Sequence, residues 1–158
     1  MKTMQQWFDE YGESHQNQVN KAFHWICVPS IFFSLIGLLS TIPLPFLNYQ
    51  GDNSTYLHVG SLLIALGLIF YARVSIPMFF GMALFSYLVL FLNKRLGQSI
   101  EMNYALFNFI LFALAWVGQF IGHKIEGKKP SFFKDLQFLL IGPAWLMGFI
   151  YRKIGLKY

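Results

Sequence analysis

Long apolar runs between widely spaced charged residues dominate the pattern along the chain. Five intervals without Asp, Glu, Lys or Arg lie between Lys21 and Asp52, Asp52 and Arg73, Arg73 and Lys94, Glu101 and Lys124, and Asp135 and Arg152. A helix needs roughly 20 mostly apolar residues to cross the hydrocarbon core of a bilayer. Four of the intervals are long enough, so the pattern predicts four membrane-spanning helices. We expect these helices near residues 18–40, 57–73, 76–93 and 104–124.

The fifth interval is shorter and reads LQFLLIGPAWLMGFIY, with Gly142 and Pro143 near its middle. A proline inside a helix removes a backbone hydrogen bond and clashes with the preceding turn. At membrane depth such a break needs cover from protein or water. We therefore expect a re-entrant or interfacial helix pair here in preference to a fifth span. The predicted fold class is an all-α polytopic membrane bundle, with four spans plus a re-entrant or fifth helix in a single domain over residues 1–158.

The positions of Lys and Arg near the spans predict the orientation of the bundle. Loop 48–56 contains neither residue type, whereas segment 124–134 and the C-terminal RKIGLK are both basic. We therefore expect the loop to face away from the cytoplasm, and both basic segments and the N-terminus to face it. Lys94 and Arg95 then lie on the opposite side, against the rule.

Composition supports a membrane protein and narrows the class of its partners. Of 158 residues, 56% are hydrophobic and 12% are charged, whereas soluble domains carry about 25% charged residues. Because so little of the surface would face water, the net charge of +5 favours anionic lipid headgroups over nucleic acid as the partner. The single cysteine, Cys27, excludes a disulfide framework and fits a buried apolar role.

Polar side chains gather where the first predicted helix begins, in the segment HQNQVNKAFHW at residues 15–25. Asn20 and His24 are four residues apart and therefore share one face of the helix. His15 lies upstream, beside the same helix start. Because ionisable and amide groups are expensive in a bilayer, those within or beside spans usually mark function.

A second polar group ends the fourth predicted helix, in the segment WVGQFIGHKIEGKKP. Gln119, His123 and Glu126 are spaced by four and then three residues, so they form one polar stripe on that helix. Gly118 and Gly122 are also four residues apart, a spacing of small residues that lets two membrane helices approach closely. This pattern favours a tight helix contact beside the polar stripe.

The predicted topology brings His15, His24 and His123 to one membrane face. Imidazole suits iron, zinc and copper, and three histidines with a weaker oxygen ligand leave open positions for substrate and oxygen. Such a site suits a non-haem ferrous ion, and zinc fits almost as well by ligand type alone. The alternative for each histidine is an interfacial hydrogen-bonding residue, which is also our interpretation of His58 at the far end of the second predicted helix.

The polar neighbours of these histidines have several possible roles. Glu126 is a candidate ligand or base, or a partner for Lys128 or Lys129. Gln119 is a candidate for orienting His123 or a bound water. Four histidines in the whole chain are too few for the histidine-rich membrane di-iron desaturases and hydroxylases.

At these two motifs the sequence resembles the family of small membrane 2-hydroxy fatty acid dioxygenases, which act in the metabolism of phytosphingosine to odd-numbered fatty acids. The resemblance covers essentially the whole chain, with the same order of apolar segments. It rests on His15, Asn17, Asn20 and His24 in HQNQVNKAFHWICVP, on Gln119, Phe120, Gly122 and His123 in QFIGHKIEGKKP, and on Pro130 and Pro143.

This resemblance implies an iron(II)-dependent dioxygenase that uses O2 to shorten a 2-hydroxy fatty acid by one carbon. By the same resemblance His15, His24 and His123 would bind Fe2+. The implied catalytic side chains are Asn20, Gln119 and Glu126.

The substrate would bind through its hydroxyl and carboxylate, with its acyl chain in an apolar groove between helices. Lys124, Lys128 or Lys129 would attract the carboxylate. The implied location is a bacterial inner membrane, or the endoplasmic reticulum in eukaryotic relatives, with the histidines near the cytoplasmic face. The alternatives are a non-enzymatic lipid-binding membrane protein and a zinc-dependent lipid hydrolase.

Overall fold

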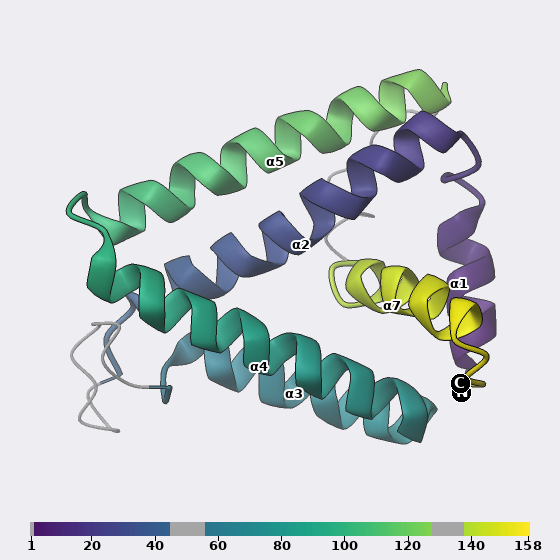
Figure 1. The fold of residues 1–158 in the computed structure, drawn as a ribbon, viewed down its shortest axis with the longest axis horizontal. Helices are drawn as coiled ribbons and strands as arrows, with labels where there is room; N and C mark the ends of the chain where they lie inside the picture. Colours follow the sequence, from purple (N-terminus) through teal and green to yellow (C-terminus); the bar gives the residue numbers. More distant parts are fainter. Residues whose placement is uncertain (1, 45–55, 128–137) are drawn as a thin grey trace.

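The computed structural model describes residues 2–44, 56–127 and 138–158, and in these ranges all the regular elements longer than a turn are helices (Figure 1). Of the features predicted above, Lys128, Lys129, Pro130 and loop 48–56 apart from Tyr56 lie outside the described residues. The helices are α1 (Met4–Gly12), α2 (Gln18–Ser40), α3 (Val59–Val74), α4 (Ile76–Ser99), α5 (Tyr104–Glu126) and α7 (Ile141–Lys153). The predicted all-α class is confirmed, and α2 to α5 coincide with the four predicted helices.

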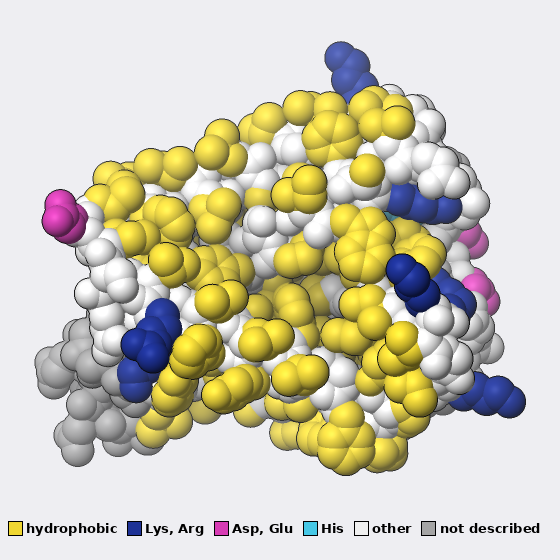
Figure 2. All heavy atoms as spheres, in the orientation of Figure 1, with side chains coloured by type: hydrophobic (Ala, Val, Ile, Leu, Met, Phe, Trp, Pro, Cys, Tyr) yellow, Lys and Arg dark blue, Asp and Glu magenta, His cyan; other side chains and the backbone are white. Residues whose placement is uncertain are grey.

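Three of these helices are long and apolar enough to cross a membrane: α2, α4 and α5, with 23, 24 and 23 residues. Helix α3 is also apolar but has only 16 residues. Large apolar side chains, among them Leu66, Phe80, Leu84 and Leu114, lie exposed on the outside of the bundle. Hydrophobic side chains cover much of the face in Figure 2. A bilayer would cover such a surface, so the structure supports a membrane protein.

The four long helices form two antiparallel pairs, α2 with α5 and α3 with α4 (Figure 1). The pairs meet at the end where α2 leads toward α3 and diverge toward the end where α2 begins. Helices α7 and α1 lie at this wider end, where α7 contacts α1, α2 and α4. The start of α2, the end of α5 and the C-terminus are therefore at the same end of the bundle.

Two glycines of α5 allow the close contact between α2 and α5. A Cβ atom at Gly118 would lie 2.5 Å from Sγ of Cys27, and one at Gly122 would lie 2.5 Å from Oδ1 of Asn20. Neither distance is compatible with a side chain, so glycine is required for α5 to approach α2 this closely. The predicted role of the small-residue spacing is confirmed. The contact lies beside His123 and therefore fixes how far His123 is from α2.

The helix pair predicted around Gly142 and Pro143 remains a prediction, but these two residues do not interrupt a helix. Pro143 is the third residue of a single helix, α7, which begins at Ile141. In the first turn of a helix the backbone N–H has no intrahelical partner, so a proline there removes no hydrogen bond. The chain before residue 138, where the other half of the predicted pair would lie, is outside the described residues.

Helix α1 precedes the first predicted span, and the pattern of long apolar runs did not predict it. Thr3 and Gln6 form a capping box at its start, and Met4, Phe8 and Tyr11 are its buried face. The Phe8 ring fills the space at Gly148 of α7, where a Cβ atom would lie 2.7 Å from Cε2 of Phe8. Helix α1 thus docks on α7 and carries the chain to His15.

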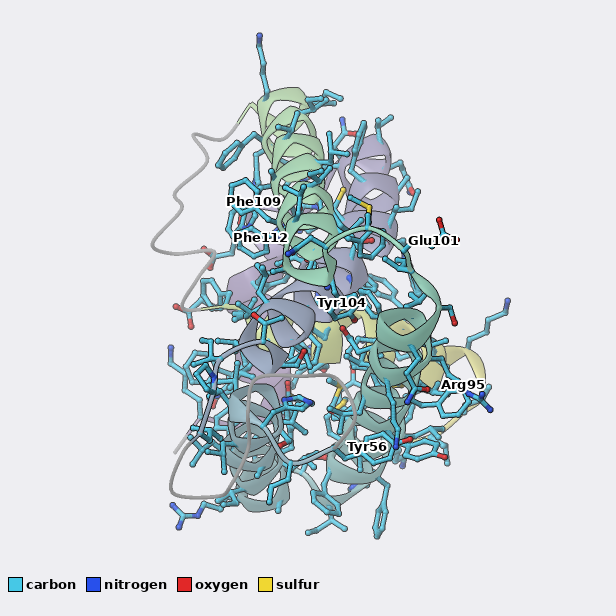
Figure 3. The ribbon with its side chains drawn as sticks, turned by 90° about the vertical axis from the view of Figure 1, so that its left-hand side faces the viewer. Tyr56, Arg95, Glu101, Tyr104, Phe109 and Phe112 are labelled. Atoms are coloured by element: carbon cyan, nitrogen blue, oxygen red, sulfur yellow. The ribbon has the colours of Figure 1, made fainter. Side chains whose placement is uncertain are left out.

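A buried polar cluster joins the helices at the other end of the bundle. The Tyr104 hydroxyl of α5 donates to Oδ1 of Asn93 at 2.5 Å, and Nδ2 of Asn93 donates to the carbonyl of Phe33 in α2 at 3.2 Å. Tyr56, Arg95 and Glu101 lie at this same end (Figure 3). The basic pair at residues 94–95 is therefore opposite the start of α2, as the predicted topology required.

The glycine contact leads to a prediction on stability. Gly118→Leu should lower the stability of the detergent-purified protein by at least about 1–3 kcal/mol, because the new side chain overlaps Cys27 and forces the helices apart. Ala113→Leu is the matched control, since Ala113 is exposed on the same helix. Thermal unfolding measures both variants, and an equal melting temperature for the two would contradict the assigned contact.

Candidate metal centre

Three histidines from separate parts of the chain meet at the wider end of the bundle. His15 lies in the turn between α1 and α2, His24 lies in the second turn of α2, and His123 lies near the end of α5. Their exposed fractions are 1%, 1% and 3%. Each offers one ring nitrogen such that the three atoms lie within 4.8 Å of one another. The predicted convergence is confirmed, and the ligand role of the three remains a prediction.

The rings of His15 and His24 face each other through their Nε2 atoms, which are 2.8 Å apart. The His123 ring centroid lies 5.1 Å from that of His15 and 5.2 Å from that of His24, with the rings steeply inclined. Tyr11 stacks on the other side of His15, with ring centroids 4.2 Å apart and planes inclined by 14°. The stacking holds the His15 ring in its orientation toward His24.

The hydrogen bonds of the two facing rings fix where their protons lie. Nδ1 of His15 is 2.5 Å from the carbonyl oxygen of Tyr11, and Nδ1 of His24 is 2.9 Å from that of Asn20. A carbonyl oxygen only accepts, so each Nδ1 carries the proton and donates it. Each neutral ring then presents an unprotonated Nε2 lone pair to the other. Two such lone pairs at this separation repel unless a cation lies close to both.

Protonation of His15 does not relieve this arrangement at neutral pH. Burial lowers the pKa of His15 to about 4, because desolvation penalises the charged form of the ring. The imidazole is therefore neutral near pH 7, which is the form that binds metals. Histidine ligands of metals usually donate their other ring N–H to a carbonyl or carboxylate, as His15 and His24 do here.

Glu126, the last residue of α5, holds the turn that leads into α2. Its carboxylate accepts hydrogen bonds from the backbone N–H groups of Gln16 at 2.8 Å and Asn17 at 2.9 Å. It also accepts from Nδ2 of Asn20 at 3.0 Å. Both carboxylate oxygens are thus used, and Glu126 is outside the group of three histidines. A ligand or base role for Glu126 remains a prediction, and its proposed pairing with Lys128 or Lys129 lies outside the described residues.

Asn20 links this carboxylate to the histidines. Its side chain is fully buried, and Nδ2 donates to the Glu126 carboxylate and to the backbone carbonyl of Ser14. The backbone carbonyl of Asn20 accepts from Nδ1 of His24. Its own carboxamide oxygen faces Gly122 of α5. In the structure Asn20 is therefore a connection between the ends of α5 and α2. Its predicted catalytic role remains a prediction.

His58 lies outside the histidine group. It is the N-cap of α3, where its Nδ1 accepts a hydrogen bond from the backbone N–H of Ser61 at 3.3 Å. A side chain that accepts from the first turn of a helix satisfies a donor that the helix itself leaves open. The capping contact agrees with the interpretation of His58 as a residue other than a ligand.

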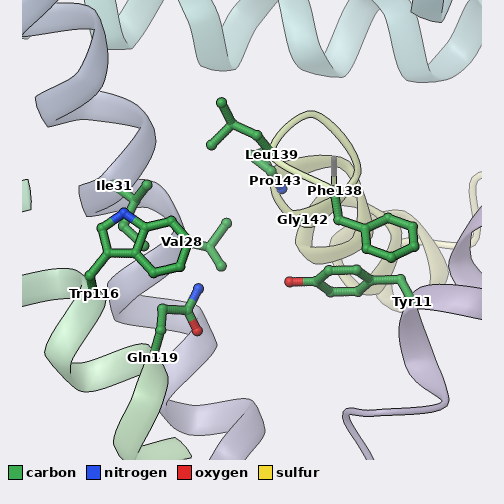
Figure 4. A pocket seen from close by; sticks show the side chains of 9 residues that line it. All are labelled: Tyr11, Val28, Ile31, Trp116, Gln119, Phe138, Leu139, Gly142 and Pro143. Atoms are coloured by element: carbon green, nitrogen blue, oxygen red, sulfur yellow. The ribbon is translucent and has the colours of Figure 1, made fainter. Parts of the chain in front are cut away.

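A small, partly open cavity lies between α1, α2, α5 and the start of α7, and two of its lining residues, Tyr11 and Gln119, adjoin the histidines (Figure 4). Gln119 lines it from α5, and Tyr11 lines it from α1. Most of the remaining lining is apolar, including Val28, Ile31 and Trp116. Sequence reasoning named Gln119 and missed Tyr11. The signal for Tyr11 was its place in the series Met4, Phe8, Tyr11 and His15, which repeats every three or four residues along one helix face.

The donor set fits a divalent transition metal. Three buried imidazoles, two with their Nδ1 protons fixed on carbonyls, offer neutral nitrogen ligands that suit iron, zinc or copper. The group that the described residues form contains no carboxylate, so a bound ion would keep positions for other ligands. A hydrophobic cavity beside such a centre suits a lipid substrate.

Comparisons with known proteins match nearly the whole chain to one family. Residues 1–154 match the family model described as "2-hydroxy-palmitic acid dioxygenase Mpo1-like". A relative from Saccharomyces cerevisiae, named 2-hydroxy-palmitic acid dioxygenase MPO1, is 27% identical over 149 residues, which are 92% of this chain and 78% of the relative. No solved structure matches the chain. On this evidence the chain belongs to the Mpo1-like family.

Proposed function

We propose that this protein is an iron(II)-dependent dioxygenase that shortens 2-hydroxy fatty acids by one carbon. The observation that carries the proposal is the pair of facing Nε2 atoms of His15 and His24, 2.8 Å apart and buried beside His123. The family match over residues 1–154 supports a dioxygenase of 2-hydroxy fatty acids in particular.

His15, His24 and His123 would hold the iron. Bound iron(II) supplies the one-electron chemistry that lets O2 react with a closed-shell substrate. The carbonyls of Tyr11 and Asn20 keep the Nδ1 protons in place, and so keep the Nε2 atoms available. Glu126 and Asn20 act as positioning residues, because they connect the ends of α5 and α2 that carry His123 and His24.

The reaction balances with O2 as the sole oxidant. For a substrate R–CH(OH)–COOH, the C1–C2 bond breaks, C2 becomes the carboxyl carbon of R–COOH, and C1 leaves as CO2 with one water. C2 loses three electrons in this change and C1 loses one, and O2 accepts all four. The reaction needs no separate reductant.

The protein lies in the membrane with its histidine end at the cytoplasmic face, in a bacterial inner membrane. Helices α2 to α5 are the four spans, and α7 packs between them from the cytoplasmic side. Three basic residues lie in the last turns of α5 and α7, at the histidine end: Lys124, Arg152 and Lys153. Lys and Arg are enriched on the cytoplasmic side of membrane proteins. Lys124 is exposed beside the centre and attracts the carboxylate of a fatty acid from the headgroup region.

Metal analysis is the first test of this function. Protein purified in detergent and loaded anaerobically should hold about one iron per chain, because three neutral imidazoles form one ligand set. His15→Ala, His24→Ala and His123→Ala should each lose the iron. His58→Ala is the matched control and should retain it, since His58 caps α3 outside the group.

The metal found also separates the proposal from its alternatives. Zinc retained in preference to iron, together with lipid hydrolysis, would indicate a zinc hydrolase. Folded wild-type protein that binds neither metal would indicate a non-enzymatic lipid-binding protein. Either result contradicts the oxygenase proposal.

Turnover of labelled substrate is the second test. Iron-loaded protein given 2-hydroxypalmitic acid with ¹³C at C1 should release ¹³CO2 and form pentadecanoic acid, and only when O2 is present. With ¹⁸O2, mass spectrometry should find one ¹⁸O atom in the pentadecanoic acid. His123→Ala should lower turnover by more than the roughly 10–100-fold typical of outer partners of a metal site. Equal product formation without O2 would rule the reaction out.

A further inference from the structure

Residues that line the cavity described above follow two helices away from the histidines. Val28 and Ile31 follow His24 along α2 by about one and two turns, and Gln119 and Trp116 precede His123 along α5 in the same way. Because α2 and α5 are antiparallel, both series point from the histidines toward the middle of the bundle. The cavity therefore has a histidine end and an apolar end.

Two polar groups stand at the histidine end. Figure 4 shows the Tyr11 hydroxyl and the Gln119 carboxamide pointing toward each other from opposite walls. Both are tied to the metal centre, because the Tyr11 ring stacks on His15 and Gln119 lies one turn before His123. A ligand that enters the centre from the cavity passes between them.

Gln119 has an acceptor that the described residues do not satisfy. Its side chain is 7% exposed, and its Oε1 is buried and accepts no hydrogen bond from the part of the chain that the structure describes. Buried polar atoms are nearly always hydrogen-bonded, so an exception calls for a donor beyond the described residues. The Gln119 side chain lines the cavity, and a ligand bound there could supply this donor once the carboxamide turns its oxygen toward it.

Gly142 keeps space for the opposite group. A Cβ atom at this position would lie 3.2 Å from the Tyr11 hydroxyl oxygen and 3.2 Å from Cγ1 of Val28. Any other residue would therefore crowd the cavity where the hydroxyl projects into it. The absence of a side chain at Gly142 thus leaves room for the Tyr11 hydroxyl at the start of α7.

We propose that Gln119 and Tyr11 bind the C2 hydroxyl of the substrate, and that the apolar end of the cavity binds the first methylene groups of its acyl chain. This inference rests on the proposed function and adds the residues that select for the hydroxyl. The C2 hydroxyl donates to Oε1 of Gln119, and the Tyr11 hydroxyl donates to an oxygen of the same head group. A fatty acid without the hydroxyl leaves Oε1 of Gln119 unsatisfied, and so binds less well.

The test compares the binding of two fatty acids. Affinities of 2-hydroxypalmitic acid and palmitic acid are measured by calorimetry on the iron-loaded protein in detergent, without O2 so that no turnover occurs. Wild-type protein should prefer the hydroxy acid. Gln119→Leu should reduce that preference by about tenfold, since one hydrogen bond is lost, and Tyr11→Phe should reduce it in the same direction. Iron content should stay at the wild-type value in both variants.

Matched controls separate recognition from damage to the fold. Gln98→Leu and Tyr87→Phe make the same changes at exposed positions of α4, and both should keep the wild-type preference. Val28→Phe narrows the apolar end and should weaken the binding of both acids equally, with the ratio unchanged. A folded Gln119→Leu protein that retains the full preference would overturn the proposal.

The outcomes also distinguish this inference from the proposed function. If the protein oxidises 2-hydroxypalmitic acid but neither variant changes the preference, the dioxygenase function stands and the inference is wrong. If no oxidation occurs but the preference exists and is lost in the variants, the inference stands and the oxygenase chemistry is wrong.

Discussion

Two backbone carbonyls, those of Tyr11 and Asn20, determine the chemistry of this end of the molecule. Each accepts the Nδ1 proton of the histidine four residues later along the chain. The Tyr11 carbonyl is available because it lies in the last turn of α1, where carbonyls have no intrahelical partner. Both Nε2 atoms are left as lone pairs facing each other in a buried space. A cation satisfies that arrangement better than any contact within the described residues.

The surrounding helices serve to bring these atoms together. Docking of α1 on α7 places His15, and the close approach allowed by Gly118 and Gly122 places His123 against α2. Glu126 then joins the end of α5 to the backbone N–H groups that precede α2. An ion pair would have depended on long flexible side chains, whereas a carboxylate on backbone donors fixes the main chain itself. The centre is therefore held by elements from three parts of the sequence.

Much of this architecture follows from the sequence, for identifiable reasons. Charge-free runs of membrane length located α2, α4 and α5, because few charges are tolerated inside a bilayer. The spacing of Gly118 and Gly122 predicted a close helix contact on that face of α5, and the structure shows that α2 is the partner. Pro143 does not interrupt α7 because it lies in the first turn of that helix, and the apolar run around it did not reveal where the helix begins.

Other features have no signature in the sequence alone. The partners of Glu126 are mainly backbone N–H groups, which every residue type except proline provides, so no motif marks them. Helix α1 has a short apolar face, and its packing partner α7 lies more than 100 residues later in the chain. That Tyr11 and Gln119 face each other is likewise a product of the tertiary structure.

The central claim is that three imidazoles share one iron ion. X-ray absorption spectroscopy at the iron K-edge of the reduced, loaded protein measures the number of imidazole ligands directly. The account predicts three imidazole ligands, from His15, His24 and His123, with oxygen ligands completing the set. A spectrum with sulfur ligation, or with fewer than three imidazoles, would contradict it.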